Sequence, residues 1–127
     1  MKNNSLDYGA ARAFKCARRD QFRDRDDVGR RRAVIDEIFT EDCVFHDPNN
    51  GTYRGRDEID RIAGAIKATH PDFQYQPIAE PDVSGDGGRI QWVSGRLGEA
   101  PAYAGTDFLI ARDGRITAVY LFFDKLP

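Results

Sequence analysis

The chain has 127 residues and a mass of 14.3 kDa, which suits one domain covering residues 1–127, with about the first five residues outside its folded part. Hydrophobic residues make up 40% and charged residues 31%, so the composition excludes a disordered polar chain, and no apolar run approaches the roughly 20 residues that span a membrane. The net charge of -2 disfavours nucleic-acid binding, because attraction to phosphates requires a basic surface.

Two helices are predicted at the start of the chain. Apolar residues at three- and four-residue steps predict a first amphipathic helix that runs to about Phe22, with Phe14 on its apolar side. A second helix follows, with Asp26 or Asp27 placed to cap its first turn. The apolar positions of this second helix are Val28, Ile35, Ile38 and Phe39.

A strand follows the second helix. From Asp42 the hydrophobic period changes to two, which predicts a strand that Pro48 ends. Cys43, Phe45 and Asp47 share one side of this strand, and Val44 and His46 share the other. A short extended segment is then expected at residues 52–54.

A third helix and a set of strands fill the rest of the chain. The helix begins at Gly55 or Asp57, carries an apolar stripe and ends before Pro71. Asp113-Gly114 is the best hairpin signal. The predicted strands are Phe73–Gln76, Arg89–Leu97, Tyr103–Arg112 and Arg115–Phe123. Helices followed by antiparallel strands predict an α+β domain, in which a curved sheet buries its apolar face under the helices.

The first third of the chain is rich in charge. Its arginines include Arg18, Arg19, Arg23, Arg25, Arg30, Arg31 and Arg32, and the aspartates among them are Asp20, Asp24, Asp26 and Asp27. We interpret this pattern as a solvated helix pair with many ion pairs, in preference to a polyanion site. A contact of Arg30, Arg31 and Arg32 with an acidic partner is a weaker alternative.

The N-terminus and the cysteines bear on the cellular compartment. The N-terminal residues include Lys2 but no apolar signal core, which predicts a cytoplasmic protein. Cys16 and Cys43 are therefore expected to be buried thiols instead of a disulfide.

Three spaced patterns accompany this order of elements. They are Phe39-x-x-Asp42-x-x-x-x-Asp47-Pro48, Tyr53-x-Gly55-Arg56-x-x-Ile59 and Gly105-x-Asp107-x5-Asp113-Gly114-Arg115-Ile116. Together they make nearly the whole chain resemble the SnoaL-like branch of the nuclear transport factor 2-like superfamily. The resemblance implies a cystatin-like α+β roll, in which about three helices from the N-terminal half cover a cone-shaped, strongly curved antiparallel sheet. It also implies a cavity at the wide end of the cone and frequent dimerisation through the sheet.

The resemblance implies roles for two aspartates. Asp47 matches the aspartate that serves as the proton-shuttling base in ketosteroid isomerases. Asp107 matches the acid/base aspartate of SnoaL-type cyclases. No tyrosine occupies the matching position of the first helix, where Arg18 or a neighbouring residue falls, so steroid isomerisation itself is disfavoured.

Each aspartate also has a structural alternative. A carboxyl group at the mouth of an apolar cone loses solvation and can exchange protons with a bound molecule. Asp47 could instead build a turn with Pro48, its carboxylate accepting backbone hydrogen bonds. Asp107 lies on a strand that is apolar on both faces, so strand parity does not choose the cavity face. A buried carboxylate there either contacts a ligand or pairs with an arginine such as Arg96.

Other chemistry receives little support. His46 is adjacent to Asp47 but points to the opposite face of the strand, so the two are not expected to act as a dyad. His46, His70, Asp47 and Asp72 lack a compact ligand spacing, and we therefore predict no metal and no other cofactor. The residues predicted to bind a ligand are the aromatic side chains of Tyr53, Trp92, Tyr120 and Phe14, with core packing as the alternative.

These observations predict a protein that binds a small, largely apolar molecule. The first hypothesis is a cofactor-independent acid/base enzyme of the isomerase, cyclase, dehydratase or epoxide-hydrolase type that uses Asp47 and Asp107. The alternative is a non-catalytic ligand-binding or dimeric interaction module with the same fold. A homodimer is expected from the apolar faces of the last strand, especially residues 118–123.

Overall fold

A computed structural model describes residues 9, 11, 13–15, 28–49 and 51–126. Positions 9, 11 and 13–15 are helical, in agreement with the predicted first helix. The predictions for Cys16, Arg18 and the caps Asp26 and Asp27 lie outside the described residues, as do those for the other charged residues between 18 and 27.

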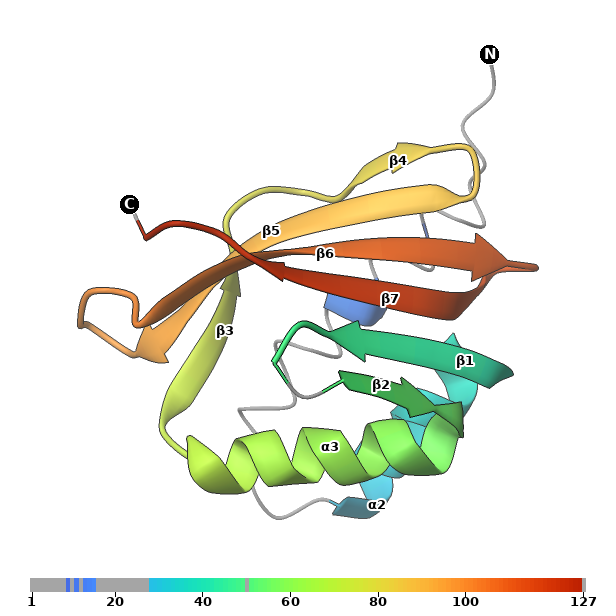
Figure 1. Ribbon diagram of the computed structural model, residues 1–127, viewed down its shortest axis with the longest axis horizontal. Helices are drawn as coiled ribbons and strands as arrows, with labels where there is room; N and C mark the ends of the chain where they lie inside the picture. The colour runs from blue at the N-terminus through green and yellow to red at the C-terminus, as the bar shows by residue number, and fades with distance from the viewer. Residues whose placement is uncertain (1–8, 10, 12, 16–27, 50, 127) are drawn as a thin grey trace.

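In the described part of the chain, seven strands form one sheet and two further helices precede or interrupt them (Figure 1). The helices are α2 (Val28–Ile38) and α3 (Gly55–Thr69). The strands are β1 (Phe39–Asp47), β2 (Gly51–Arg54), β3 (Phe73–Pro77), β4 (Asp82–Ser84), β5 (Gly87–Arg96), β6 (Tyr103–Arg112) and β7 (Arg115–Phe123). The strand order is β2-β1-β7-β6-β5-β3, and β4 also pairs with β5. The α+β prediction, with a curved sheet and helices, is confirmed.

One strand pair departs from the antiparallel expectation. β1 runs parallel to β7, with Phe45 opposite Val119, whereas the other paired strands are antiparallel. Parallel neighbours require a long connection, and here α3 and the strands β2 to β6 lie between the two strands in the chain. β1 and β7 therefore lie side by side within the sheet, with β2 next to β1 and β6 next to β7.

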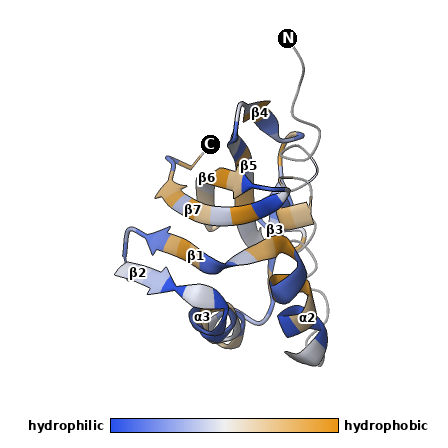
Figure 2. Ribbon diagram, turned by 90° about the vertical axis from the view of Figure 1, so that its right-hand side faces the viewer, coloured by the Kyte–Doolittle hydropathy of each residue, from blue (hydrophilic) through white to orange (hydrophobic). Residues whose placement is uncertain are grey.

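The helices cover one face of the sheet, which we call the inner face. Buried side chains from α2 and α3, such as Ile35 and Ile59, form one core cluster with strand residues such as Phe45, Leu109 and Val119. Figure 2 shows α2 and α3 on the same side of the molecule, below β1 and β7. The inner face is thus the buried face, and its neighbouring residues on each strand point to an outer face.

The start and end of α3 follow from its sequence. Asp57 and Glu58 lie in the first turn and Lys67 in the last, so each charge complements the nearer end of the helix dipole. Gly55 has a positive φ of 84°, which lets the chain leave β2 and enter the helix directly. Pro71 follows the helix, as the sequence predicted.

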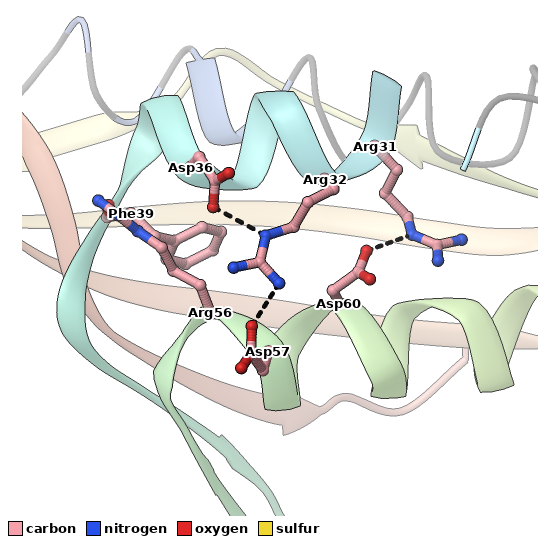
Figure 3. Close-up of polar contacts among 7 residues, drawn as sticks. All are labelled: Arg31, Arg32, Asp36, Phe39, Arg56, Asp57 and Asp60. Atoms are coloured by element: carbon pink, nitrogen blue, oxygen red, sulfur yellow. Dashed lines mark hydrogen bonds and ion pairs between the residues drawn. The ribbon is translucent and has the colours of Figure 1, made fainter. Parts of the chain in front are cut away.

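Polar contacts hold α2, α3 and β1 together (Figure 3). The Nε of Arg31 contacts Asp60 Oδ1 at 2.8 Å, and both side chains are largely shielded from solvent. The guanidinium of Arg56 donates two hydrogen bonds, of 3.0 and 2.6 Å, to the carbonyl oxygen of Phe39, where α2 gives way to β1. Gly64 leaves room for Arg31, because a Cβ there would lie 3.1 Å from its Nη2 atom.

The ion pairs predicted for the arginine-rich segment are confirmed where they can be seen, but with different partners. Arg31 pairs with Asp60, and Arg32 pairs with both Asp36 and Asp57 (Figure 3). These acids lie on α2 itself and on α3, so the pairs connect two helices. Among the described residues, no helix combines the length and apolar character needed to cross a membrane.

Candidate active site on the inner face of the sheet

Asp107 lies at the centre of the inner face. On β6 it is opposite Ile90 of β5 and Leu121 of β7, and both of these neighbours are buried core residues. The side chain of Asp107 is 0% exposed. The structure thus settles a question that strand parity left open, because Asp107 shares the helix-covered face with Leu109 and Ala111.

Tyr75 of β3 supplies a hydrogen bond to this carboxyl group. Its hydroxyl donates to Asp107 Oδ2 at 3.3 Å, and the contact is buried. Burial of a carboxyl group costs several kcal/mol unless polar partners compensate, and a phenol is one such partner. The alternative that named Arg96 as a partner of Asp107 is not seen, since Arg96 contacts Asp72 at 2.6 Å near the surface.

Trp92 fixes the position of Tyr75. The two rings lie 5.4 Å apart, and β5 carries Trp92 while also pairing with β3. Trp92 crosses the inner face above Gly105, where a Cβ would come within 2.3 Å of its Cζ2 atom. Only glycine leaves space for the indole at this position. Gly105 therefore allows the Trp92 ring to pack on the inner face two residues from Asp107 along β6.

Asp47 lies on the same face at the end of β1. It is 7% exposed, and its Oδ1 atom accepts a hydrogen bond of 2.8 Å from the backbone N–H of Asn49. This contact is the turn-building interaction that sequence reasoning kept as the alternative to catalysis. The pairing of Phe45 with Val119 places Asp47 beside Leu121, which is itself opposite Asp107. One strand therefore separates the two aspartates, a backbone separation of about 10 Å.

A hollow of about 430 Å³ lies beside the edge strand β3. Neither aspartate is among the residues that line it, but Tyr75 is. Its lining residues are Lys15, Gln74, Tyr75, Gln76, Pro77, Ile78, Ala79 and Glu80. Tyr75 therefore connects the hollow to Asp107, since it is one of the lining residues and its hydroxyl contacts the carboxyl group.

Three of the four predicted ligand-binding aromatics are packed in the core. Phe14 meets Phe39 edge to face at 5.9 Å, and Tyr53 has the guanidinium carbon of Arg61 5.6 Å from its ring centroid. Trp92 belongs to the same core cluster and is the one in contact with Tyr75. All three residues are thus part of the core, and their proposed role in ligand binding stays a prediction.

Tyr120 lies on the opposite face of the sheet from Asp107. It stands beside Phe108 on the outer face, is partly exposed, and stacks on His46 at 4.5 Å. The structure therefore does not bring Tyr120 together with the two aspartates. The alternation predicted for β1 is confirmed, because Asp47 is inward while His46 pairs with Tyr120 on the outer side.

Two other groups clarify the electrostatics. Cys43, a free thiol on the inner side of β1, is fully buried, and this burial raises its pKa, so the thiol stays protonated at neutral pH. In contrast, the exposed Asp42 accepts hydrogen bonds from Arg112, which lower the pKa of its carboxyl to about 2. Within the described residues, no three His, Cys, Asp or Glu side chains gather as metal ligands would.

Sequence reasoning missed Tyr75 and Lys15 as site residues. Tyr75 could have been found as the inward member of the alternating segment Phe73–Gln76, but its contact with Asp107 depends on the pairing of β3 with β5. Lys15 gave no signal, because its partner Glu80 is remote in the sequence.

Solved structures of similar fold support this architecture. A proposed isomerase of the SnoaL-like family from Agrobacterium tumefaciens superposes with a TM-score of 0.81 and 22% identity, covering 95% of this chain and 99% of that one. A protein of unknown function from Mesorhizobium loti, described as like nuclear transport factor 2, gives a TM-score of 0.73 and 20% identity, covering 98% of this chain and 96% of the other.

A proposed polyketide cyclase from Sinorhizobium meliloti is also similar. It has 25% identity and a TM-score of 0.61, covering 76% of this chain and 85% of its own. No curated protein matches the chain. The sequence profile of the SnoaL-like domain matches residues 21–119, which is most of the chain. The protein therefore belongs to the SnoaL-like domain family.

Proposed function

We propose that this protein binds a small, largely apolar molecule on the inner face of its sheet and acts on it by acid/base chemistry, with Asp107 as the proton-transferring group. The observation that carries the proposal is the fully buried carboxyl group of Asp107, with the hydroxyl of Tyr75 at 3.3 Å. A carboxyl group in a dry site is costly for stability, and proton transfer to a bound molecule is a use that such a position serves.

The reaction class follows from the groups available. A carboxyl group and a phenol can move a proton between carbon and oxygen atoms of a bound molecule without any cofactor, as isomerisation, cyclisation, dehydration and epoxide opening require. The likeness to a proposed polyketide cyclase at 25% identity supports this class. Asp47 is the second candidate acid/base group, since it faces the same side about two strand spacings away.

The test uses three probes that report three proton-transfer reactions. These are 2-tetralone for exchange of its α protons in D₂O, 4-hydroxy-4-phenylbutan-2-one for dehydration, and styrene oxide for ring opening, each followed by NMR. We expect the wild-type protein to accelerate at least one of them, and Asp107→Asn to lower that rate about 10²- to 10⁴-fold. The asparagine oxygen can still accept the Tyr75 hydrogen bond, so the variant changes the chemistry and preserves the contact.

Asp47→Asn distinguishes an acid/base role of Asp47 from a purely turn-building role. An asparagine oxygen can accept the Asn49 N–H as the carboxylate does, so the turn survives while the acid/base group is lost. A reduced rate in this variant would assign Asp47 a part in the reaction, and full turnover would leave it a turn-building residue. Full turnover by Asp107→Asn would overturn the main proposal.

A second function, a dimeric interaction module, is favoured by a different observation. Three aromatic side chains on the outer face are 39 to 52% exposed, namely Phe108, Tyr120 and Phe122. We propose that a second copy of the chain covers them. If the wild-type protein accelerates none of the three probe reactions but forms this dimer, the non-catalytic function is the better description.

A further inference from the structure

The hollow beside β3 contains a positive charge that is largely shielded from solvent. Lys15 reaches it from the helical residues 13–15, and its side chain is only 12% exposed. The Nζ atom lies 2.8 Å from Glu80 Oε2. A shielded ammonium group needs an anionic or strongly polar partner, and Glu80 fills this role in the structure.

Glu80 is a partner that can leave. It lies in the connection between β3 and β4, and its side chain is 61% exposed, in contrast to that of Lys15. A carboxylate that is already mostly in water loses little solvation by turning outward, so another anion can take its place beside Lys15. The pair is therefore asymmetric, with a fixed, shielded cation and an exposed, exchangeable anion.

The remaining walls of the hollow suit an organic molecule. Pro77 and Ile78 offer apolar surface, while the side chains of Gln74 and Gln76 offer amide donors and acceptors. A volume of about 430 Å³ falls within the range of small-molecule sites. At the inner end, the Tyr75 hydroxyl leads to Asp107.

We propose that this hollow binds a small organic acid, whose carboxylate replaces Glu80 at the Lys15 ammonium while its apolar body lies along Pro77 and Ile78. Glu80 then acts as an internal competitor that occupies Lys15 when the ligand is absent. The statement that such a ligand reaches the reacting groups rests on the proposed function. The carboxylate–ammonium contact stands on the hollow and the ion pair alone.

The experiment compares two probes of nearly equal shape, 2-naphthoate and its uncharged counterpart 2-naphthamide, by titration calorimetry at low ionic strength. We expect the wild-type protein to bind 2-naphthoate at least about 10-fold more tightly than 2-naphthamide, and the preference to shrink as salt is added. Equal affinities for the two probes, or no binding of either, would overturn the proposal.

Two variants should move this preference in opposite directions. Lys15→Met keeps the aliphatic stem and removes the charge, so it should abolish the preference for the acid. Glu80→Gln removes the competitor and should tighten 2-naphthoate binding about 3- to 10-fold, with little change for 2-naphthamide. Lys125→Met, at an exposed C-terminal position, is the control for loss of one positive charge and should bind both probes as the wild type does.

The Glu80→Gln result keeps the proposal testable if Lys15→Met does not fold. Weaker or unchanged binding of 2-naphthoate by Glu80→Gln would contradict the competition between Glu80 and ligand. Asp107→Asn distinguishes this inference from the proposed reaction, because it should bind 2-naphthoate normally even though turnover is lost. If the wild-type protein turned over a probe substrate but bound 2-naphthoate and 2-naphthamide equally well, only the Lys15 contact would be refuted.

Discussion

Asp107 and Phe108 are neighbours on β6, yet the sheet buries the carboxyl group and exposes the phenyl ring. Asp107 is 0% exposed and Phe108 is 40% exposed. Stability alone favours the opposite arrangement, since a carboxyl group prefers water and a phenyl ring prefers the core. The contrast indicates that the two faces of this sheet carry separate tasks, with proposed chemistry on the inner face and proposed association on the outer face.

The largest expected effect concerns the wall of the inner face. Gly105→Ala would place a Cβ 2.3 Å from Trp92 and 2.9 Å from the carbonyl oxygen of Phe122, so the indole or the strand must move. We expect a loss of about 3 kcal/mol in the free energy of unfolding, measured with urea. Gly87→Ala is the control, because its Cβ would meet nothing closer than 3.4 Å. Equal stability of the two variants would show that Trp92 can shift to accommodate the added methyl group at little cost.

The outer face is tested by placing charge on it. Phe108→Glu combined with Phe122→Glu alters two rings that contact each other 5.5 Å apart, and each carboxylate would have to be buried in a dimer. We expect the dimer dissociation constant, measured by sedimentation velocity, to rise at least about 100-fold. Leu97→Glu, which alters an exposed residue in the turn after β5, should leave association unchanged. A wild-type protein that is monomeric at micromolar concentration would refute the association.

A smaller effect is expected for the hydrogen bond inside the inner face. Tyr75→Phe removes the hydroxyl that donates to Asp107, and we expect a loss of about 1–2 kcal/mol in urea unfolding. Adding Asp107→Leu to this variant should recover part of the loss, because both polar partners are then replaced by apolar groups. If the two changes were simply additive, the hydroxyl and the carboxyl group would not be coupled.

The smallest effect is expected at the exposed pair of Asp42 and Arg112, which belongs neither to the candidate site nor to the exposed aromatic cluster. The pKa of Asp42 is lowered from 3.8 to about 2 in the folded protein by its hydrogen bonds with Arg112. Its contribution to stability is therefore present above pH 3.8 and is lost as the pH falls toward 2. Asp42→Asn should differ slightly from the wild type in thermal melting at pH 6 and not at all near pH 2. A difference that persists near pH 2 would have another origin.

The sequence predicted the strands that carry this contrast, but misplaced others. β6 and β7 have the predicted bounds, since alternating residues and Asp113-Gly114 mark them clearly. Phe39 was assigned to the second helix, yet it begins β1, because it pairs with Ile116 near the other end of the chain. β4 was missed, as its three residues gain their strand conformation from pairing with β5.

The candidate site could be predicted only in part. The inward position of Asp47 followed from the alternation in β1, whereas the face of Asp107 required the helices to be seen in place, because both sides of β6 are apolar. The hydrogen bond from Tyr75 and the ion pair of Lys15 with Glu80 join segments that are remote in the sequence. Such contacts depend on strand order, which no local pattern contains.

The parallel pairing of β1 with β7 has a consequence for how the protein is made. β1 ends at Asp47, but the strand that completes its second edge begins only at Arg115. During synthesis the early hairpin therefore has one unpaired edge until β7 has been made. We expect a ribosome-bound chain that stops at Asp113 to remain sensitive to protease, and a chain whose β7 has left the ribosome to become resistant.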